Sequence, residues 1–255
     1  MIILLSPSKR LDFNAKRVIE HFTIPQFMEE SSVIMETLRK YSPAKLVKLM
    51  SINSGLAREN YDRFQSWNLP FEPNNSIPAI FAFKGEVYHG LVSETLKNSD
   101  LEYAQEKLRI LSGLHGILKP FDLIRPYRLE MGTKLKVGRN RNLYTYWATK
   151  ITESINNDLA QDGSNILVNL ASVEYFMAVD TNKLNAEIIT PQFLDFKNGS
   201  YKFLTVYGKK ARGRMARFII ENRISKPEEL KLFDADGYYY NFNLSKDNSW
   251  VFTRG

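Results

Sequence analysis

The dipeptide Asn198-Gly199 constrains the fold of this chain more than any other short feature, because it lies between two strand-like runs. Asn-Gly is the strongest short signal for a two-residue β-hairpin, since both residues tolerate the left-handed backbone that such a turn needs. We therefore expect strands over Ala186–Asp195 and Tyr201–Tyr207. A helical stretch is expected directly afterwards, over Lys209–Ile224, so an antiparallel pair and helices must share one fold.

The other elements are expected in an irregular order along the chain. Apolar runs predict further strands over Ile2–Leu5, Ile80–Phe83, Ile166–Leu170, Tyr238–Phe242 and Trp250–Thr253. Helices are expected over residues 25–66 in three pieces, from Asp100 to Leu111, from Phe121, and over Leu143–Leu159. This irregular order favours an α+β fold with a mixed sheet over a doubly wound α/β fold. Residues 1–255 contain no repeat or obvious linker and are expected to form a single compact unit.

The chain contains no cysteine and three histidines among its 255 residues. Without cysteine there can be no disulfide, thiolate zinc site or thiol peroxidase chemistry. The three histidines, His21, His89 and His115, lack metal-ligand spacing, so neither a histidine-rich metal site nor a cofactor is expected. A carboxylate site for Mg²⁺ stays open.

No segment of the sequence has the length of a membrane anchor or a secretion signal. The apolar run Ile2–Leu5 is shorter than a signal-peptide core and has no basic residue before it. No stretch approaches the 18 apolar residues that a membrane span needs. We therefore expect a cytoplasmic protein with no membrane partner.

The positive charge of the chain is concentrated in one segment. The formal net charge is +7. Between Ser200 and Lys226 there are eight Lys or Arg residues and one acid, Glu221, and eight minus one is +7, so the rest of the chain sums to zero. Such a segment favours a polyanion-binding site, although a solvated helix face is the alternative. Glu221 is the only acid within the segment, so intrahelical pairing does not explain its bases, and we expect Lys209, Lys210, Arg212, Arg214 and Arg217 to be free to contact DNA phosphates.

Three loops that follow predicted strands carry candidate catalytic residues. Lys9 follows the first strand, Lys84 follows Ile80–Phe83, and Glu174 follows Ile166–Leu170. Loops at strand ends often hold functional groups on a rigid base. Each lysine can bind a phosphate or act as a nucleophile if it is desolvated. The structural alternatives are a surface turn for Lys9, an ion pair for Lys84 and a helix N-terminus for Glu174.

A glycine-containing turn, Gly113-Leu-His-Gly116, lies between two segments that the periodicity predicts to be helical. This arrangement suggests a helix-hairpin-helix, in which glycines let backbone N–H groups face a phosphate. The usual Pro-Gly-apolar-Gly core is absent, and a plain helical turn is the alternative. Lys119, Arg125 and Arg128 follow the turn and are expected to add charge contacts to DNA.

Taken together, seven motifs in one order resemble the YaaA family over essentially the whole chain. They are Leu5–Lys9 with Leu11–Asp12, Ala82–Tyr88, Leu111–Pro120, Pro126–Gly132, Asn169–Ser172 with Glu174–Phe176, Leu184–Ile189, and Lys209–Gly213 with Arg217–Arg223. The sequence departs from the family pattern at His115, where tyrosine is more usual, and at Ser8, where alanine is common.

The resemblance implies a role in resistance to hydrogen peroxide and in limiting damage from intracellular iron. It also implies DNA binding, with a helix-hairpin-helix beside a positive cleft. On that basis Gly113, Gly116 and Lys119 map onto the hairpin. Basic motif residues that the resemblance places near the cleft are Lys9, Lys84, Arg128, Lys209, Lys210 and Arg212.

Three functional hypotheses follow. The first is a cytoplasmic DNA-binding protein with little sequence preference, which protects against peroxide and iron damage. The second is a lyase- or glycosylase-like enzyme on DNA bases or nucleotides, with Lys9 or Lys84 as nucleophile and Glu174 or Glu130 as acid or base. A flipped base would then lie against an aromatic wall from Tyr88, Tyr127 or Tyr175. The third is a nonenzymatic iron-handling or partner-binding protein.

Overall fold

The computed structural model describes residues 1–14, 19 and 21–255 and has an α+β fold built on one mixed sheet. Five strands at its centre run parallel in the order β12-β9-β8-β1-β5. Their bounds are β1 Ile2–Leu5, β5 Leu108–Ser112, β8 Ile166–Leu170, β9 Glu187–Lys197 and β12 Ser249–Arg254. Antiparallel strands complete the sheet: β6 Gly116–Leu118 on β5, β10 Ser200–Lys202 on β9, and β11 Tyr239–Tyr240 on β12.

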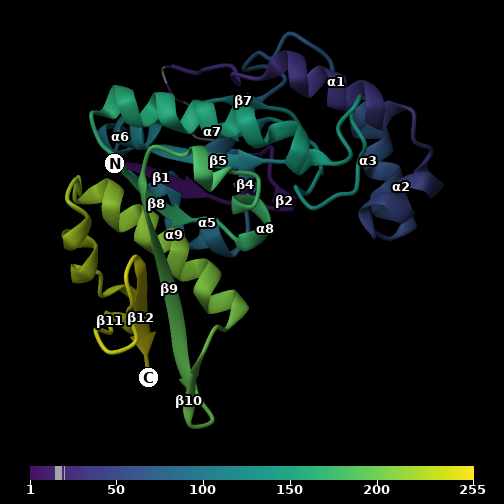
Figure 1. Ribbon diagram of the computed structural model, residues 1–255. Coiled ribbons are helices and arrows are strands. Elements are labelled where there is room, and N and C mark those ends of the chain that lie inside the picture. Colours follow the sequence, from purple (N-terminus) through teal and green to yellow (C-terminus); the bar gives the residue numbers. More distant parts are fainter. Residues whose placement is uncertain (15–18, 20) are drawn as a thin grey trace.

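Helices cover both faces of this sheet (Figure 1). Helix α7, Leu143–Asp162, packs on one face against β1 and β6, and helix α9, Thr205–Glu221, packs on the other against β1, β8 and β9. Burial on both sides explains why β1 and β8 are almost continuously apolar rather than alternating. Helix α7 begins at Leu143 because the Asn142 side chain caps it, accepting the N–H of Thr145 at 2.9 Å.

The remaining elements surround this core. The other helices are α1 Met28–Arg39, α2 Pro43–Met50, α3 Ser54–Ser66, α4 Ala79–Ala82, α5 Glu86–Leu91, α6 Asn98–Lys107 and α8 Val173–Phe176. Short 3₁₀ turns are η1 Ser93–Thr95, η2 Thr181–Lys183, η3 Pro227–Leu232 and η4 Ala235–Gly237. Two small antiparallel pairs join β2 Arg10–Leu11 to β4 Phe83–Lys84, and β3 Ile77–Pro78 to β7 Leu123–Ile124. Within the described residues, no helix is both long and apolar enough to cross a bilayer.

The hairpin at Asn198-Gly199 is confirmed. Both residues have positive φ, 53° and 78°, as a two-residue turn of this kind requires. The hairpin links β9 to β10 and lies at the far end of the long β9 strand (Figure 1). The second strand is shorter than predicted, because the chain leaves the sheet after Lys202 and α9 begins at Thr205.

The predicted helix-hairpin-helix at Gly113–Gly116 is wrong, because this turn joins two strands. Helix α6 ends at Lys107, and β5 pairs with β1 on one side and β6 on the other. Burial in the middle of the sheet overrides the helical periodicity of this segment. The helix predicted from Phe121 is likewise absent, since that stretch is a turn that leads into β7.

The glycines of this turn serve packing. The indole N–H of Trp147 on α7 donates to the carbonyl of Gly113 at 3.0 Å. Gly116 has φ +70°, and a Cβ there would lie 2.7 Å from the Trp147 ring. Both glycines are buried, so neither presents a backbone N–H group at the surface.

Candidate functional site

Two loops that are far apart in sequence meet at the carboxyl ends of β1 and β8. The strands are in register, with Leu5 opposite Leu170, so both chains leave the sheet at the same edge. The backbone N–H of Ser172 donates to the hydroxyl oxygen of Ser6 at 2.8 Å. In sheets with parallel strands, ligands bind beyond the carboxyl ends of the strands, which makes this edge the first place to look for a site.

A third loop, Lys84–Tyr88, closes this edge from the side. Arg10 pairs with Lys84 where β2 meets β4, and the Tyr88 hydroxyl donates to the carbonyl of Ser6 at 3.1 Å. Gly85 has φ +126°, and a Cβ there would lie 2.7 Å from the Ser8 hydroxyl oxygen. The positive φ is the reason that residue 85 favours glycine. The three loops with candidate catalytic residues therefore do come together.

Helix α9 supplies the last wall, and the result is a cleft of ≈ 640 Å³. This size lies within the range of small-molecule and cofactor sites. We call it the basic cleft, and it is lined by Ser6–Arg10, Gly85–Tyr88, Ser172–Tyr175, Lys209 and Arg212.

Two glycines bring α9 close enough to reach the cleft. A Cβ on Gly213 of α9 would overlap the carbonyl oxygen of Val87 on α5, and one on Gly90 of α5 would overlap the carbonyl oxygen of Lys210. The two helices therefore pack backbone to backbone. This contact, rather than phosphate binding, accounts for the glycine within the basic run of α9.

Most basic residues of α9 are paired. Lys210 Nζ lies 3.2 Å from Asp236 in η4, and Arg214 Nε lies 3.7 Å from the same carboxylate oxygen. Arg217 pairs with Glu221 one turn later, at 2.7 Å, and donates to the carbonyls of Leu91 and Val92. The expectation that no acid neutralises this helix face is wrong.

Lys209 and Arg212 differ from the other basic residues of α9. Neither makes an ion pair or a side-chain hydrogen bond with any residue of the described chain. Arg212 is partly buried at the edge of the basic cleft, and burial lowers the pKa of its guanidinium. The ring centroid of Phe203 lies 5.6 Å from the guanidinium carbon of Arg212. A partly desolvated cation without a carboxylate favours an external anion.

The candidate catalytic residues already have partners. Lys9 Nζ lies 2.5 Å from Glu130, and the carboxylate of Glu130 also pairs with Arg128 at 2.9 Å. Lys84 pairs with Glu94, and Glu174 accepts the backbone N–H of Gly132 at 3.1 Å. The Lys9 side chain is 59% exposed, so it lacks the desolvation that turns a lysine into a nucleophile.

The floor of the basic cleft is aromatic. Tyr88 and Tyr175 line the cleft, and both are buried. Tyr127 is buried as well, with its hydroxyl 2.6 Å from that of Ser112. Burial raises the pKa of all three tyrosines well above its ordinary value, so they keep their protons at neutral pH. Rings packed in this way support the cleft from below.

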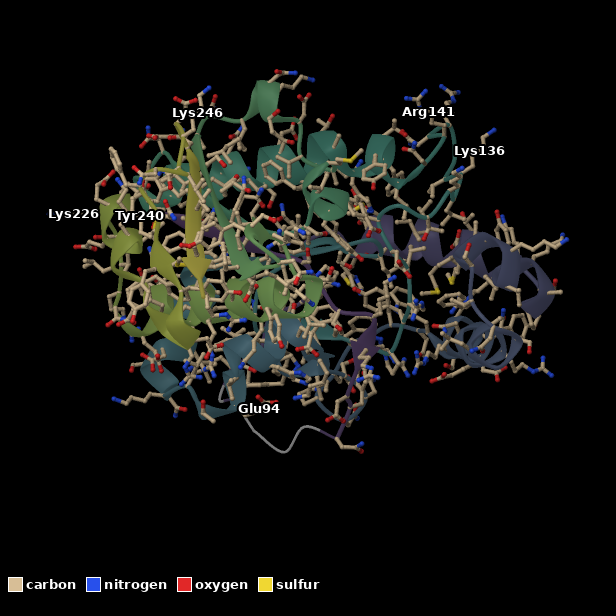
Figure 2. The ribbon with its side chains drawn as sticks, turned by 90° about the horizontal axis from the view of Figure 1, so that it is seen from below. Glu94, Lys136, Arg141, Lys226, Tyr240 and Lys246 are labelled. Atoms are coloured by element: carbon tan, nitrogen blue, oxygen red, sulfur yellow. The ribbon has the colours of Figure 1, made fainter. Side chains whose placement is uncertain are left out.

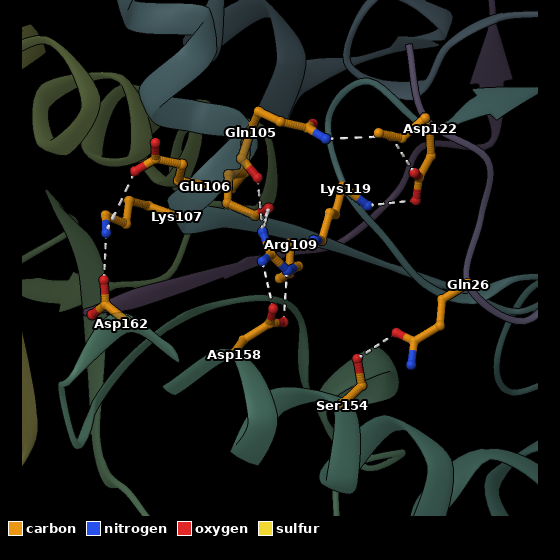
Figure 3. Close-up of polar contacts among 12 residues, drawn as sticks. Gln26, Gln105, Glu106, Lys107, Arg109, Lys119, Asp122, Ser154, Asp158 and Asp162 are labelled. Atoms are coloured by element: carbon orange, nitrogen blue, oxygen red, sulfur yellow. Dashed lines mark hydrogen bonds and ion pairs between the residues drawn. The ribbon is translucent and has the colours of Figure 1, made fainter. Parts of the chain in front are cut away.

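Of the predicted DNA-contacting residues, Lys209 and Arg212 line the basic cleft and the others do not, and Lys119 and Arg125 border separate hollows. Lys119 borders a separate hollow of ≈ 360 Å³, where its backbone N–H donates to Asp122 at 2.8 Å and the buried pair Arg109–Asp158 lies close by (Figure 3). Arg125 lines another hollow and hydrogen-bonds to Asn68. Other cations lie on the periphery: Lys226 and Lys246 at one end of the molecule, Lys136 and Arg141 at the other (Figure 2).

The structure adds residues that the sequence pattern did not single out. Arg10 lines the basic cleft and is exposed, and its position next to Lys9 was the signal for it. Phe203 lay inside a predicted strand, which hid its place beside Arg212. Asp236 pairs with α9 across a long stretch of chain, so no local pattern indicated it. Among the described residues, no group of three His, Cys, Asp or Glu is placed to hold a metal ion.

Comparison with known proteins identifies relatives along the whole chain. The model of the family described as "Peroxide stress protein YaaA" matches residues 1–244. A UPF0246 protein of Aliivibrio fischeri is 50% identical over 254 residues, which cover 100% of this chain and 98% of that protein. A UPF0246 protein of Hahella chejuensis is 46% identical over 254 residues, covering 100% of this chain and 99% of that relative.

Proposed function

The chain belongs to the peroxide stress protein YaaA family, and from this premise we propose that it is a cytoplasmic protein that binds DNA through the basic cleft. The observation that carries the proposal is Arg212, a partly buried cation on the cleft wall with no acidic partner in the described chain. Lys209 lies next to it on α9 and is also unpaired within the described residues. A phosphate supplies the negative charge that these two residues lack.

The arrangement of cations favours contact with the DNA backbone rather than base reading. Lys209 and Arg212 come from α9, and Arg10 comes from β2 in another wall of the cleft. Contacts from several walls to phosphates position a nucleic acid but carry no sequence information. The proposal therefore includes little sequence preference.

The residues proposed for DNA contact change once the structure is considered. Lys209 and Arg212 line the basic cleft and stay in the set. Lys9 also stays because it lines the cleft, although it pairs with Glu130, and Arg10, an exposed cation of the same cleft, is added. Gly113 and Gly116 are left out because they are buried, and Lys119 and Arg125 because they border other hollows. Five further basic residues are left out because each pairs with an acid outside the cleft lining: Lys84, Arg128, Lys210, Arg214 and Arg217.

A role in peroxide stress fits DNA binding better than peroxide chemistry by the protein itself. The chain has no cysteine, so a thiol cannot reduce peroxide here. Bound protein shields the backbone from oxidants or holds damaged DNA for repair. The lysine-nucleophile alternative has less support, because Lys9 and Lys84 are both held in ion pairs.

A salt series of fluorescence anisotropy with a labelled duplex tests the proposal. The variant is Lys209→Gln with Arg212→Gln, and the matched control is Lys226→Gln with Lys246→Gln, two exposed cations outside the basic cleft. Both doubles remove the same charge. We expect only the cleft double to weaken binding and to lower the slope of log K against log salt by about 1.8, which is about 0.9 for each phosphate that is no longer neutralised. If both double variants bind DNA equally weakly, DNA is attracted by the overall positive charge, and binding through the basic cleft is contradicted.

A further inference from the structure

A second hollow of ≈ 600 Å³ adjoins the basic cleft and shares Arg212 and Val173 with it. It forms because β8 ends at Leu170 while β9 continues to Lys197, so the edge of β9 that pairs with β8 loses that partner beyond the end of β8. Helix α8 and the chain leading into α9 form its sides. We call it the apolar hollow.

The apolar hollow is lined by side chains that are unusually exposed for their type. Val173 is 76% exposed, Met177 is 61% exposed and Phe203 is 46% exposed. Phe176 is partly buried beside them. Single exposed apolar residues are ordinary, but a group of them around one hollow marks a binding surface.

The absence of a side chain at Gly208 of α9 leaves room for the Phe203 ring. A Cβ on Gly208 would overlap that ring, so glycine at residue 208 is what allows Phe203 to lie there. The Arg212 guanidinium lies against the same ring. An aromatic face and a cation without an acidic partner in the described chain therefore stand side by side at the junction of the two hollows.

The apolar hollow also contains a fixed polar group. Asn169, at the end of β8, is 6% exposed, and its side-chain oxygen accepts the backbone N–H of Ala171 at 3.1 Å. This bond orients the amide, whose nitrogen donates to no other residue of the described chain. A small number of oriented polar groups in an apolar wall is typical of a site for a polar heterocycle.

We propose that the apolar hollow binds one unpaired base of DNA while the phosphate of the same nucleotide pairs with Arg212 and Lys209. This inference rests on the proposed DNA binding in the basic cleft. The faces of a base are accessible only when it is out of the duplex stack, and aromatic side chains then bind them by stacking. Positive charge beside the hollow matches the phosphate that every nucleotide carries.

The two hollows would hold different parts of the same nucleotide, with the base in the apolar hollow and the phosphate in the basic cleft. Arg212 serves both hollows, so a nucleotide that spans them makes contacts that a regular duplex cannot make. DNA with a bulged base should therefore bind more tightly than the same duplex without it. Phe203 contributes only to the bulged DNA, whereas Arg212 contributes to both.

The test measures binding of a duplex and of the same duplex with a single bulged 2-aminopurine, whose fluorescence falls when it stacks on a ring. The proteins are the wild type, Phe203→Ala, Phe203→Leu and Arg212→Gln. Phe203→Leu keeps apolar bulk without an aromatic face. We expect Phe203→Ala to weaken bulged-DNA binding roughly five- to one-hundredfold and to abolish the quenching. We expect Phe203→Leu to abolish the quenching as well, while both variants bind the plain duplex like the wild type.

The outcomes separate the two proposals. Wild-type affinity and quenching in Phe203→Ala overturn the base site and leave backbone binding standing. An equal weakening of duplex and bulged-DNA binding in Phe203→Ala also overturns the base site, since the ring then acts on all DNA. A wild-type protein that binds neither DNA overturns the proposed function itself.

Discussion

Gly213 on α9 lies directly against the carbonyl oxygen of Val87 on α5, with no room between them for a Cβ. Gly90 makes the reciprocal contact with the carbonyl oxygen of Lys210. This pair of contacts sets how close α9 comes to the loop Gly85–Tyr88. It therefore places Lys209 and Arg212 on the wall of the basic cleft.

Replacing Gly213 with alanine should destabilise the protein and disturb the cleft. The added methyl group must push α5 and α9 apart, and overpacking of this kind costs about 1–3 kcal/mol. Urea denaturation measures the decrease in stability. Gly55→Ala is the matched control, because its Cβ meets only Asn53 at 3.5 Å near the start of α3, where alanine favours the helix. Equal stability of Gly213→Ala and wild type would contradict the proposed role of this contact.

The buried pair Arg109–Asp158 should be sensitive to the removal of one partner. Two hydrogen bonds of 2.7 and 2.6 Å join the groups, and Arg109 also donates to the carbonyls of Gln105 and Leu108 (Figure 3). Asp158→Asn leaves a buried, unpaired guanidinium, and we expect unfolding free energy to fall by about 3–5 kcal/mol.

The control for this pair is the double variant Arg109→Met with Asp158→Leu. It removes both charges and keeps apolar bulk, so it should be more stable than Asp158→Asn and approach the wild type. Chemical denaturation compares the two. A double variant that is less stable than Asp158→Asn would show that the hydrogen bonds of Arg109 matter more than charge balance.

His115 should make stability depend on pH. Burial lowers the pKa of His115 to about 3, and its Nδ1 lies 3.0 Å from the Ser31 hydroxyl. The unfolded chain binds a proton near the ordinary value of about 6.5, whereas the folded chain does not. As pH falls from about 6 towards 4, unfolding free energy should therefore decrease, with a slope approaching about 1.4 kcal/mol per pH unit from this group.

Denaturation midpoints of wild type, His115→Gln and His89→Gln at several pH values measure this contribution. His89 is exposed, so its replacement should keep the wild-type slope. His115→Gln should have a shallower slope than both. An unchanged slope in His115→Gln would assign the pH dependence to other groups.

Glu130 should oppose DNA binding. Its carboxylate pairs with Lys9, which lines the basic cleft, and with Arg128. Glu130→Gln removes this negative charge and releases both cations, so we expect DNA affinity to rise a few-fold at low salt and to approach wild type as salt screens the charges. Weaker binding in Glu130→Gln would instead indicate that Glu130 positions the basic groups or takes part in chemistry.

Features set by local sequence were predictable. Strands β1 and β8, helix α7 and the Asn198-Gly199 hairpin follow from apolar runs and turn residues, and two loops of the basic cleft follow from the ends of β1 and β8. The third loop follows a stretch predicted as a strand over Ile80–Phe83, which is instead mostly the short helix α4. The strand β5 was mistaken for helix because only its pairing with β1 decides between the two. Pairing of Lys210 and Arg214 with Asp236 was missed for the same reason, since the acid reaches α9 through tertiary structure.

The most direct test of where DNA binds is ultraviolet crosslinking of a bound duplex, followed by mass spectrometry of the crosslinked peptides. We expect crosslinks in Ser6–Arg10, Ser172–Tyr175 and the Lys209–Arg212 turn of α9, all of which line the basic cleft. At the same protein and DNA concentrations, these crosslinks should decrease in the Lys209→Gln, Arg212→Gln variant. Crosslinks concentrated instead around Lys119 or Arg125, in the separate hollows, would contradict DNA binding through the basic cleft.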